Sequence, residues 1–363
     1  MLRDEKRVPK HSTPFPAGMP GLLYQRWEHT TRDIGRLDMS LVGIDIGGTK
    51  TIVGIADETG NLINKKRFTT IVDLGPEQII DSIKAAVWGL LREYHIDSDD
   101  ITGIGIGCGG PVDEDRGCIL TVPNMPGWEN MPLSDMFSQE FNAPAWLEND
   151  ATVAATGELH FGAGMSVHSF VYFTVSTGIG GGIVIDRRIY RGSSGSAGEF
   201  GHQIILPDGP PCTCGGNGCL EALASGTSIA RRARTECHDW PSTVLLPWVN
   251  GNTSEITAEH VSLGVEAGDE FCIRIWQDAM TYLGIGVANV VNILNPELVV
   301  LGGGVTKAGD ILFDPVRQIV AEKALNGLDR IVNVVPAALG EDVGVVGAVA
   351  TAMERLGLLH AGV

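Results

Sequence analysis

The stretch that decides the fold covers residues 41–56 and reads LVGIDIGGTKTIVGIA. Apolar residues fill both ends, and Gly47 and Gly48 interrupt them, which predicts two β-strands joined by a tight turn. Residues 170–185 (FVYFTVSTGIGGGIVI) repeat this pattern of strand, Thr-Gly turn and strand. The two stretches share a pattern more than identities. They predict two related α/β halves that face each other across a cleft.

The other segments of the chain fit a two-domain α/β plan. A helical apolar pattern covers residues 76–94, and residues 240–260 have turn residues without a clear period, which predicts a surface insertion. Short apolar runs predict buried strands at residues 101–108, 145–147 and 298–301. The predicted organisation begins with a mostly disordered extension at residues 1–39. An N-terminal α/β domain follows at residues 40–150, and a C-terminal helix at residues 343–359 completes it. The C-terminal α/β domain covers residues 151–342 and contains a loop at residues 199–221.

The composition limits the classes of partner. The chain has 363 residues, with 26 Lys and Arg against 44 Asp and Glu, so the formal net charge is −18. This acidic balance argues against a surface for nucleic acid or an anionic membrane, which needs a basic patch. Residues 279–296 carry no formal charge, but their Asn residues and Pro296 favour a helix buried between domains over a membrane span. The polar N-terminus lacks the apolar core of a signal peptide, which favours a cytoplasmic protein.

Three cysteines and one histidine predict a metal site. Cys212, Cys214 and Cys219 have the spacing C-x-C-x4-C, and His202 lies upstream of them. One imidazole and three thiolates complete a tetrahedral Zn²⁺ shell with no open position, which indicates structural zinc. The alternative is chance clustering of free thiols. A closed loop would also fix Glu199 and Glu221 near each other, and these carboxylates with the imidazole would suit the hydroxyls of a sugar; solvated surface positions are the alternative.

Three glycine runs are candidate nucleotide sites. Adjacent glycines in a hairpin let backbone N–H groups converge on an anion, and a strand-end Asp is placed to hold Mg²⁺. The candidates are Asp45, Gly47, Gly48, Thr49 and Lys50 at the first turn, Thr177 and Gly178 at the second, and Gly302, Gly303 and Gly304 where a nucleoside would lie flat. The alternative for each run is an ordinary turn, and the P-loop spacing GxxxxGK[ST] is absent.

Asp150 lies at a predicted junction between a strand and a helix, after Glu148 and Asn149. Asp at a helix N-terminus usually caps the helix. The same position also leaves a carboxylate at the mouth of a cleft, where it can accept a proton from a substrate hydroxyl. The residues alone leave both roles open.

Five motifs in order resemble the ROK family of sugar kinases and repressors, and within it the bacterial glucokinases. The strongest covers residues 195–221, GSAGEFGHQIILPDGPPCTCGGNGCLE. The others are LVGIDIGGTK (41–50), NMPGW (124–128), LENDA (147–151) and STGIGGGI (176–183). The resemblance covers residues 41–359. It implies an actin-like, two-domain ATPase fold of the ribonuclease H type, with ATP in the cleft between the domains and a hexose beside it.

The resemblance also implies the roles of individual residues. Asp150 matches the catalytic base, and the sugar contacts match Asn124, Asn149, Asp150, Glu199, His202 and Glu221. The expected activity is ATP- and Mg²⁺-dependent phosphorylation of a hexose at its 6-hydroxyl, with glucose favoured, in a homodimer or homotetramer. Alternative activities are kinases for N-acetylglucosamine, N-acetylmannosamine, mannose, allose or fructose. Polyphosphate is an alternative phosphoryl donor, and a non-catalytic sugar sensor is an alternative class of protein. Residues 1–39 are too short and irregular for the DNA-binding helix-turn-helix domain of the family's repressors.

Overall fold

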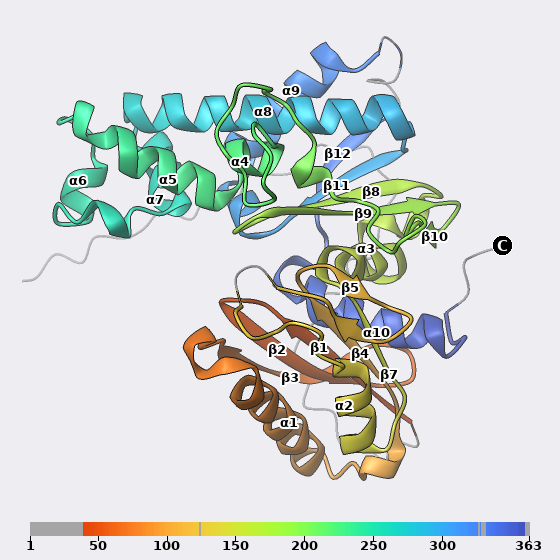
Figure 1. The fold of residues 1–363 in the computed structure, drawn as a ribbon. Coiled ribbons are helices and arrows are strands. Elements are labelled where there is room, and N and C mark those ends of the chain that lie inside the picture. Colours follow the sequence, from red (N-terminus) through yellow and green to blue (C-terminus); the bar gives the residue numbers. More distant parts are fainter. Residues whose placement is uncertain (1–38, 123–124, 326, 328–331, 360–363) are drawn as a thin grey trace, which may run out of the picture. The chain divides into compact units, whose positions relative to one another are not determined.

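The structure is a computed structural model that describes residues 39–122, 125–325, 327 and 332–359. The predicted extension, apart from Met39, lies outside the described residues, and so does the predicted sugar contact Asn124. Figure 1 labels the helices and strands.

The first sheet has five strands in the order β3-β2-β1-β4-β7. They are β1 (Ser40–Ile46), β2 (Lys50–Ala56), β3 (Leu62–Thr69), β4 (Ile101–Cys108) and β7 (Ala145–Asn149). Short turns join β1, β2 and β3, which are therefore antiparallel, whereas β4 and β7 run parallel to β1. A small hairpin of β5 (Val112–Asp113) and β6 (Cys118–Ile119) follows β4. The strand pair predicted at residues 41–56 is confirmed.

The second sheet repeats this topology with the order β10-β9-β8-β11-β12. Its strands are β8 (Phe170–Val175), β9 (Ile179–Ile185), β10 (Arg188–Ile189), β11 (Leu298–Gly302) and β12 (Asn333–Pro336). The first three are again antiparallel neighbours, and β11 and β12 run parallel to β8. The two α/β halves predicted from the repeated strand–turn–strand pattern are therefore confirmed as one topology used twice.

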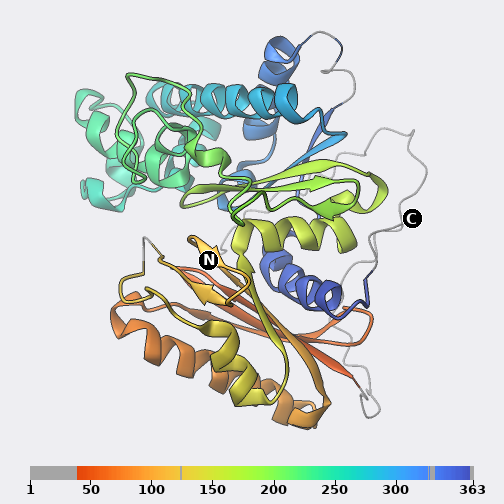
Figure 2. The ribbon, with the colours of Figure 1, turned by 45° about the vertical axis from the view of Figure 1, so that its right-hand side comes forward.

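Helices cover both faces of each sheet (Figure 1). α1 (Gly75–Glu93) and α2 (Leu133–Phe141) pack on one face of the first sheet, and α8 (Glu270–Leu294) and α9 (Asp310–Lys323) on the outer face of the second. α3 (Asp150–Phe161) and α10 (Val343–Arg355) pack against each other between the two sheets, as Figure 2 shows. α10 returns from the end of the chain to cover β1 and β4 of the first sheet.

The segment predicted as a surface insertion differs from that expectation. It carries α6 (Leu245–Trp248) and α7 (Ala258–Glu266), next to α4 (Leu220–Ala224) and α5 (Gly226–Glu236). Leu245, Val249 and Ile256 are buried in the core of the second half. Helices as short as α6 are shorter than the window in which a period shows, and this concealed their packing.

Residues 279–296 belong largely to α8, and Ala279, Leu283 and Val287 are buried in the core of the second half. The predicted buried helix is thus confirmed, but its predicted position between domains is wrong, because α8 packs within the second half on the outer face of its sheet. No helix in the described part of the chain combines the length and the hydropathy that a membrane span requires.

Candidate active site and metal centre

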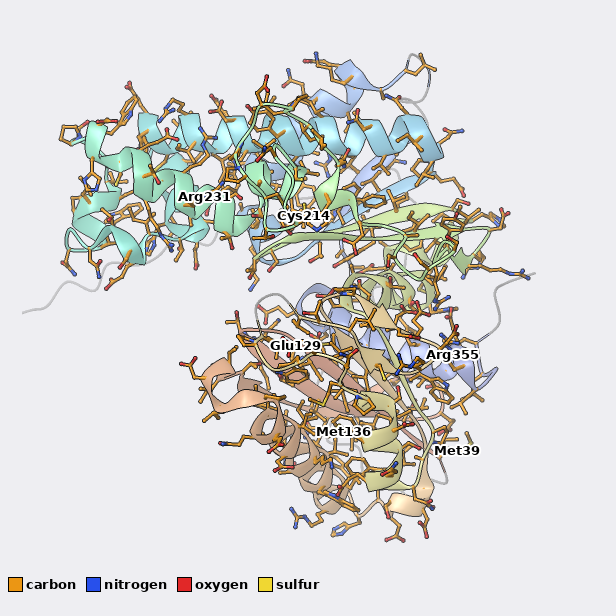
Figure 3. The ribbon with its side chains drawn as sticks, in the orientation of Figure 1. Met39, Glu129, Met136, Cys214, Arg231 and Arg355 are labelled. Atoms are coloured by element: carbon orange, nitrogen blue, oxygen red, sulfur yellow. The ribbon has the colours of Figure 1, made fainter. Side chains whose placement is uncertain are left out.

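His202, Cys212, Cys214 and Cys219 come together as their spacing predicted. Their ligand atoms all lie within 4.8 Å of one another. The Sγ atoms of Cys214 and Cys219 are 3.7 Å apart, and Cys212 Sγ lies 3.7 Å from Nδ1 of His202. Two thiolates on one tetrahedral Zn²⁺, at about 2.3 Å each, lie about 3.8 Å apart. The separations and the four-ligand His/Cys₃ set are therefore consistent with structural zinc, in the loop where Figure 3 labels Cys214.

A small hairpin holds the metal ligands in place. The Cys212 amide donates to the carbonyl oxygen of Gly216 over 2.8 Å. Gly218 has a φ of +67°, and a Cβ at this position would lie 1.5 Å from the carbonyl oxygen of Leu206, so only glycine fits. Cys219 follows immediately and leads into α4. The glycines therefore serve the geometry of the loop.

His202 faces the metal ligands on one side and Glu199 on the other. Its Nδ1 lies toward Cys212, and its Nε2 lies 3.8 Å from Oε2 of Glu199. The loop therefore sets the direction in which the imidazole presents its second nitrogen. Partial burial raises the pKa of Glu199, His202 opposes this shift, and the charges of Asp150 and Glu221 add to it. These predicted sugar contacts lie close enough to influence one another.

Glu221 links the metal loop to the second glycine turn. Its Oε2 accepts a hydrogen bond of 2.9 Å from the backbone N–H of Ile179. A Cβ on Gly178 would lie 2.4 Å from that oxygen, so glycine makes room for the carboxylate. The Thr213 hydroxyl lies 3.5 Å from the other oxygen. The side chain of Glu221 therefore joins the metal loop to the second glycine turn, which the sequence predicts as separate elements. Thr177 is exposed at the tip of that turn.

Asp150 begins α3, but Asn149 caps the helix. Asn149 Oδ1 accepts from the N–H groups of Ala151 and Thr152, at 3.0 and 3.4 Å, and its Nδ2 donates to the carbonyl oxygen of Gly110. Asp150 Oδ1 also accepts from Ala151 over 2.8 Å. Asn149 therefore supplies the cap that reaches both N–H groups, and Asp150 adds a single hydrogen bond through Oδ1.

Asp150 is exposed as a residue, although the protein around its carboxyl group desolvates it. Its Oδ2 faces Gly109, at 3.6 Å from the place where a Cβ would be. Desolvation raises the pKa of Asp150, and hydrogen bonding from Ala151 only partly opposes it. An aspartate in this state is a better proton acceptor than an ordinary surface aspartate.

Asp45 lies near the end of β1 and packs against the first turn of α10. A Cβ on Gly344 would lie 2.3 Å from Asp45 Cγ, so the helix approaches the carboxyl group only because residue 344 is glycine. Burial and the charge of Asp150, opposed by Lys50, together raise the pKa of Asp45 to about 7. A carboxylate beside a second one, with only Lys50 to offset their repulsion, is a suitable position for a divalent cation, which would lower that repulsion.

The first glycine turn is a closed hairpin. The Gly47 amide donates to the carbonyl oxygen of Lys50 over 3.0 Å, and Gly48 and Thr49 are exposed at the tip. The carbonyl oxygen of Thr49 accepts from the amide of Thr70, which ties the turn to the end of β3. The tip is therefore fixed at its base and accessible at its end.

The third glycine run lies beside the end of β8. A Cβ on Gly302 would lie 2.2 Å from the Tyr172 hydroxyl, and one on Gly303 would lie 2.5 Å from the carbonyl oxygen of Val175. These two glycines are required by packing, whereas Gly304 is exposed. The run adjoins the second turn, as a nucleotide site shared by both would need.

No pattern in the sequence predicts roles for two buried carboxylates of this region. Glu148 pairs with Arg191 over 2.8 Å. Glu158 of α3 accepts backbone hydrogen bonds from three residues, Ala163, Ala338 and Leu339. Apart from Ala163, these partners are distant in the sequence, so no local signal could have revealed them.

The chain belongs to the ROK family, which matches residues 41–355. This confirms the resemblance drawn from its motifs. The glucokinase of Thermotoga maritima is 35% identical over 319 residues, which cover 88% of this chain and 99% of the relative. A more distant relative, the xylose repressor of Bacillus subtilis, is 28% identical over 84% of this chain and 75% of its own length.

A solved structure resembles the fold closely. The ROK family glucokinase from Streptomyces griseus, in complex with glucose and AMPPNP, has a TM-score of 0.76 and 35% identity, over 87% of this chain and 99% of that chain. The expected fold class is thereby confirmed.

Proposed function

We propose that this protein is an ATP-dependent kinase that phosphorylates the 6-hydroxyl of a hexose, with glucose as the preferred acceptor. The observation that carries the proposal is Asp150. Its carboxylate shares only the N–H of Ala151 with the capping Asn149, its pKa is raised, and it lies close enough to Asp45 and Glu199 to raise their pKa values as well. Asp150 thus lies between Asp45, a predicted nucleotide contact, and Glu199, a predicted sugar contact.

Asp150 acts as the general base in the proposed reaction. It accepts the proton of the 6-hydroxyl as that oxygen attacks the γ-phosphorus and the bond to the β-phosphate oxygen breaks, which leaves ADP and the sugar phosphate. Backbone amides at the two exposed turn tips, around Thr49 and Thr177, stabilise the phosphate oxygens. Mg²⁺, which Asp45 would hold, supplies charge neutralisation to the phosphates when bound.

The metal loop orients the sugar contacts. Zinc held by His202 and the three cysteines would supply a rigid loop and no open coordination site. In that loop, Glu199 and His202 accept or donate hydrogen bonds to vicinal hydroxyls, and Asn149 stays a predicted contact alongside its capping role. The names of the relatives support glucose as the sugar and ATP as the donor.

A coupled assay of ADP release over a panel of hexoses tests this function. We expect turnover with glucose to exceed turnover with mannose, fructose, allose and the N-acetylated amino sugars, and ATP to exceed polyphosphate as donor. Turnover that is higher with another sugar would keep the kinase and correct the substrate. A thermal shift with one sugar and no turnover with any would overturn the kinase and favour a sugar sensor, in line with the repressor relatives.

A further inference from the structure

Two buried carboxylates and two more exposed arginines form a charged network beside the proposed base. Arg191 Nε lies 2.8 Å from Oε2 of Glu148 and 2.8 Å from Oε2 of Glu114. Arg355, at the end of α10 and labelled in Figure 3, reaches the same oxygen of Glu114 over 3.2 Å. The side chains of Glu148 and Glu114 are only 1% and 9% exposed. Two guanidinium groups therefore offset two carboxylates that water scarcely reaches.

The network joins segments from both halves of the protein. Glu148 belongs to β7 of the first sheet, and Glu114 follows β5. Arg191 follows β10 of the second sheet. This side chain therefore crosses from the second half to the strand that ends at the proposed base.

On one side, the network leads to Asp150. Oε1 of Glu148 accepts from the backbone N–H of Asn149 over 3.2 Å, while Oε2 holds Arg191. Asn149 in turn caps the helix that Asp150 begins. The ion pair consequently acts on the peptide unit that sets the direction of the Asp150 carboxylate.

On the other side, the network leads to the sugar contacts. The carbonyl oxygen of Arg191 accepts from the amide of Ala197 over 3.1 Å, which closes a loop two residues before Glu199. Within that loop, Gly195 lies against Glu114: a Cβ there would be 3.4 Å from Oε1. That oxygen is buried and has no hydrogen-bond partner among the described residues. The side chain of Arg191 thus contacts Glu148, next to the proposed base, and its backbone holds Ala197 in the loop before Glu199.

We propose that Arg191 is a positioning residue, which holds the proposed base Asp150 and the sugar-contact loop around Glu199 in register through its ion pairs with Glu148 and Glu114. This inference rests on the proposed function. Arginine suits the task because its planar guanidinium is always charged and can bridge two carboxylates in a fixed geometry.

Arg191→Met tests the proposal, with Arg188→Met as the matched control, since Arg188 is exposed on the adjoining β10. We expect Arg191→Met to lower kcat about 10- to 100-fold and to raise the KM and the calorimetric Kd for glucose about tenfold. The KM for ATP stays within about twofold. A merely structural role would lower the active fraction and the Tm without this split between the two substrates. Unchanged kinetics in Arg191→Met would overturn the proposal.

A double variant keeps the test decisive if Arg191→Met folds poorly. Arg191→Met with Glu148→Met removes both partners and leaves no unpaired buried charge at residue 148, so the Tm recovers toward the wild-type value. The glucose Kd and kcat stay impaired if the ion pair positions the site; their recovery together with the Tm would overturn the proposal. If the wild-type protein turns over no sugar, the proposed kinase fails, and the glucose Kd of the variants still decides the role of Arg191.

Discussion

Asp150→Asn separates the two roles that a helix-starting aspartate can have. The substitution keeps the size of the side chain and one oxygen for the N–H of Ala151, but it removes the basic carboxylate. A general base contributes roughly 10²- to 10⁴-fold to a rate. At about 1.36 kcal/mol per tenfold, the barrier should therefore rise by about 2.7 to 5.4 kcal/mol.

Although Asp150→Asn should lower the rate, it should not lower the stability of the fold. The pKa of Asp150 is raised in the folded state, so its ionised form at neutral pH opposes folding. Its charge also raises the pKa of the nearby Asp45. Asp150→Asn should consequently have a Tm equal to or above that of the wild type. Loss of the actual cap in Asn149→Ala should instead cost about 1 kcal/mol of stability.

The assay is kcat from coupled ADP release at saturating ATP and glucose, with the glucose Kd from calorimetry and the Tm from scanning calorimetry. We expect a large loss of kcat, a glucose Kd within a few-fold of the wild type, and no loss of Tm. Turnover within tenfold of the wild type would refute Asp150 as the base. A Tm that falls as far as in Asn149→Ala would show that its role is structural.

Three further predictions concern pH, the metal and the packing of α3. As the pH falls, kcat should begin to decline at a pH above the ordinary aspartate pKa of about 4, because only the ionised form of Asp150 accepts a proton and its pKa is raised. A pH profile with no acid limb would contradict this. Cys214→Ala should lose zinc, measured by metal analysis, together with affinity for glucose, whereas Cys118→Ala, outside the cluster, should keep both; full activity without metal would show that the loop does not depend on it. Glu158→Gln should lower the free energy of unfolding by about 1 to 3 kcal/mol. Both carboxylate oxygens of Glu158 accept hydrogen bonds from backbone N–H groups, and the amide nitrogen that replaces one of them cannot. Chemical denaturation measures this loss, and exposed Glu266→Gln should show none; equal values for the two variants would refute it.

The fold was largely predictable because its signals are local. Apolar runs around Gly47 and around Gly178 mark the two hairpins, and their order along the chain predicts two similar halves. The metal ligands were predictable for the same reason, since three of the four lie in one short loop. Residues 240–260 were not, because very short helices show no readable period.

The sequence by itself determined which chemical groups this protein has: a His/Cys₃ ligand set, two glycine turns, and an aspartate at a junction of strand and helix. Only the tertiary structure decided which group does what. It assigned the cap to Asn149 and left Asp150 with one hydrogen bond from Ala151, turned Glu221 toward the second glycine turn, and packed Asp45 against Gly344. These are contacts between segments distant in sequence. Their energies depend on burial and on distances of a few ångströms, which no spacing of residues along the chain can report.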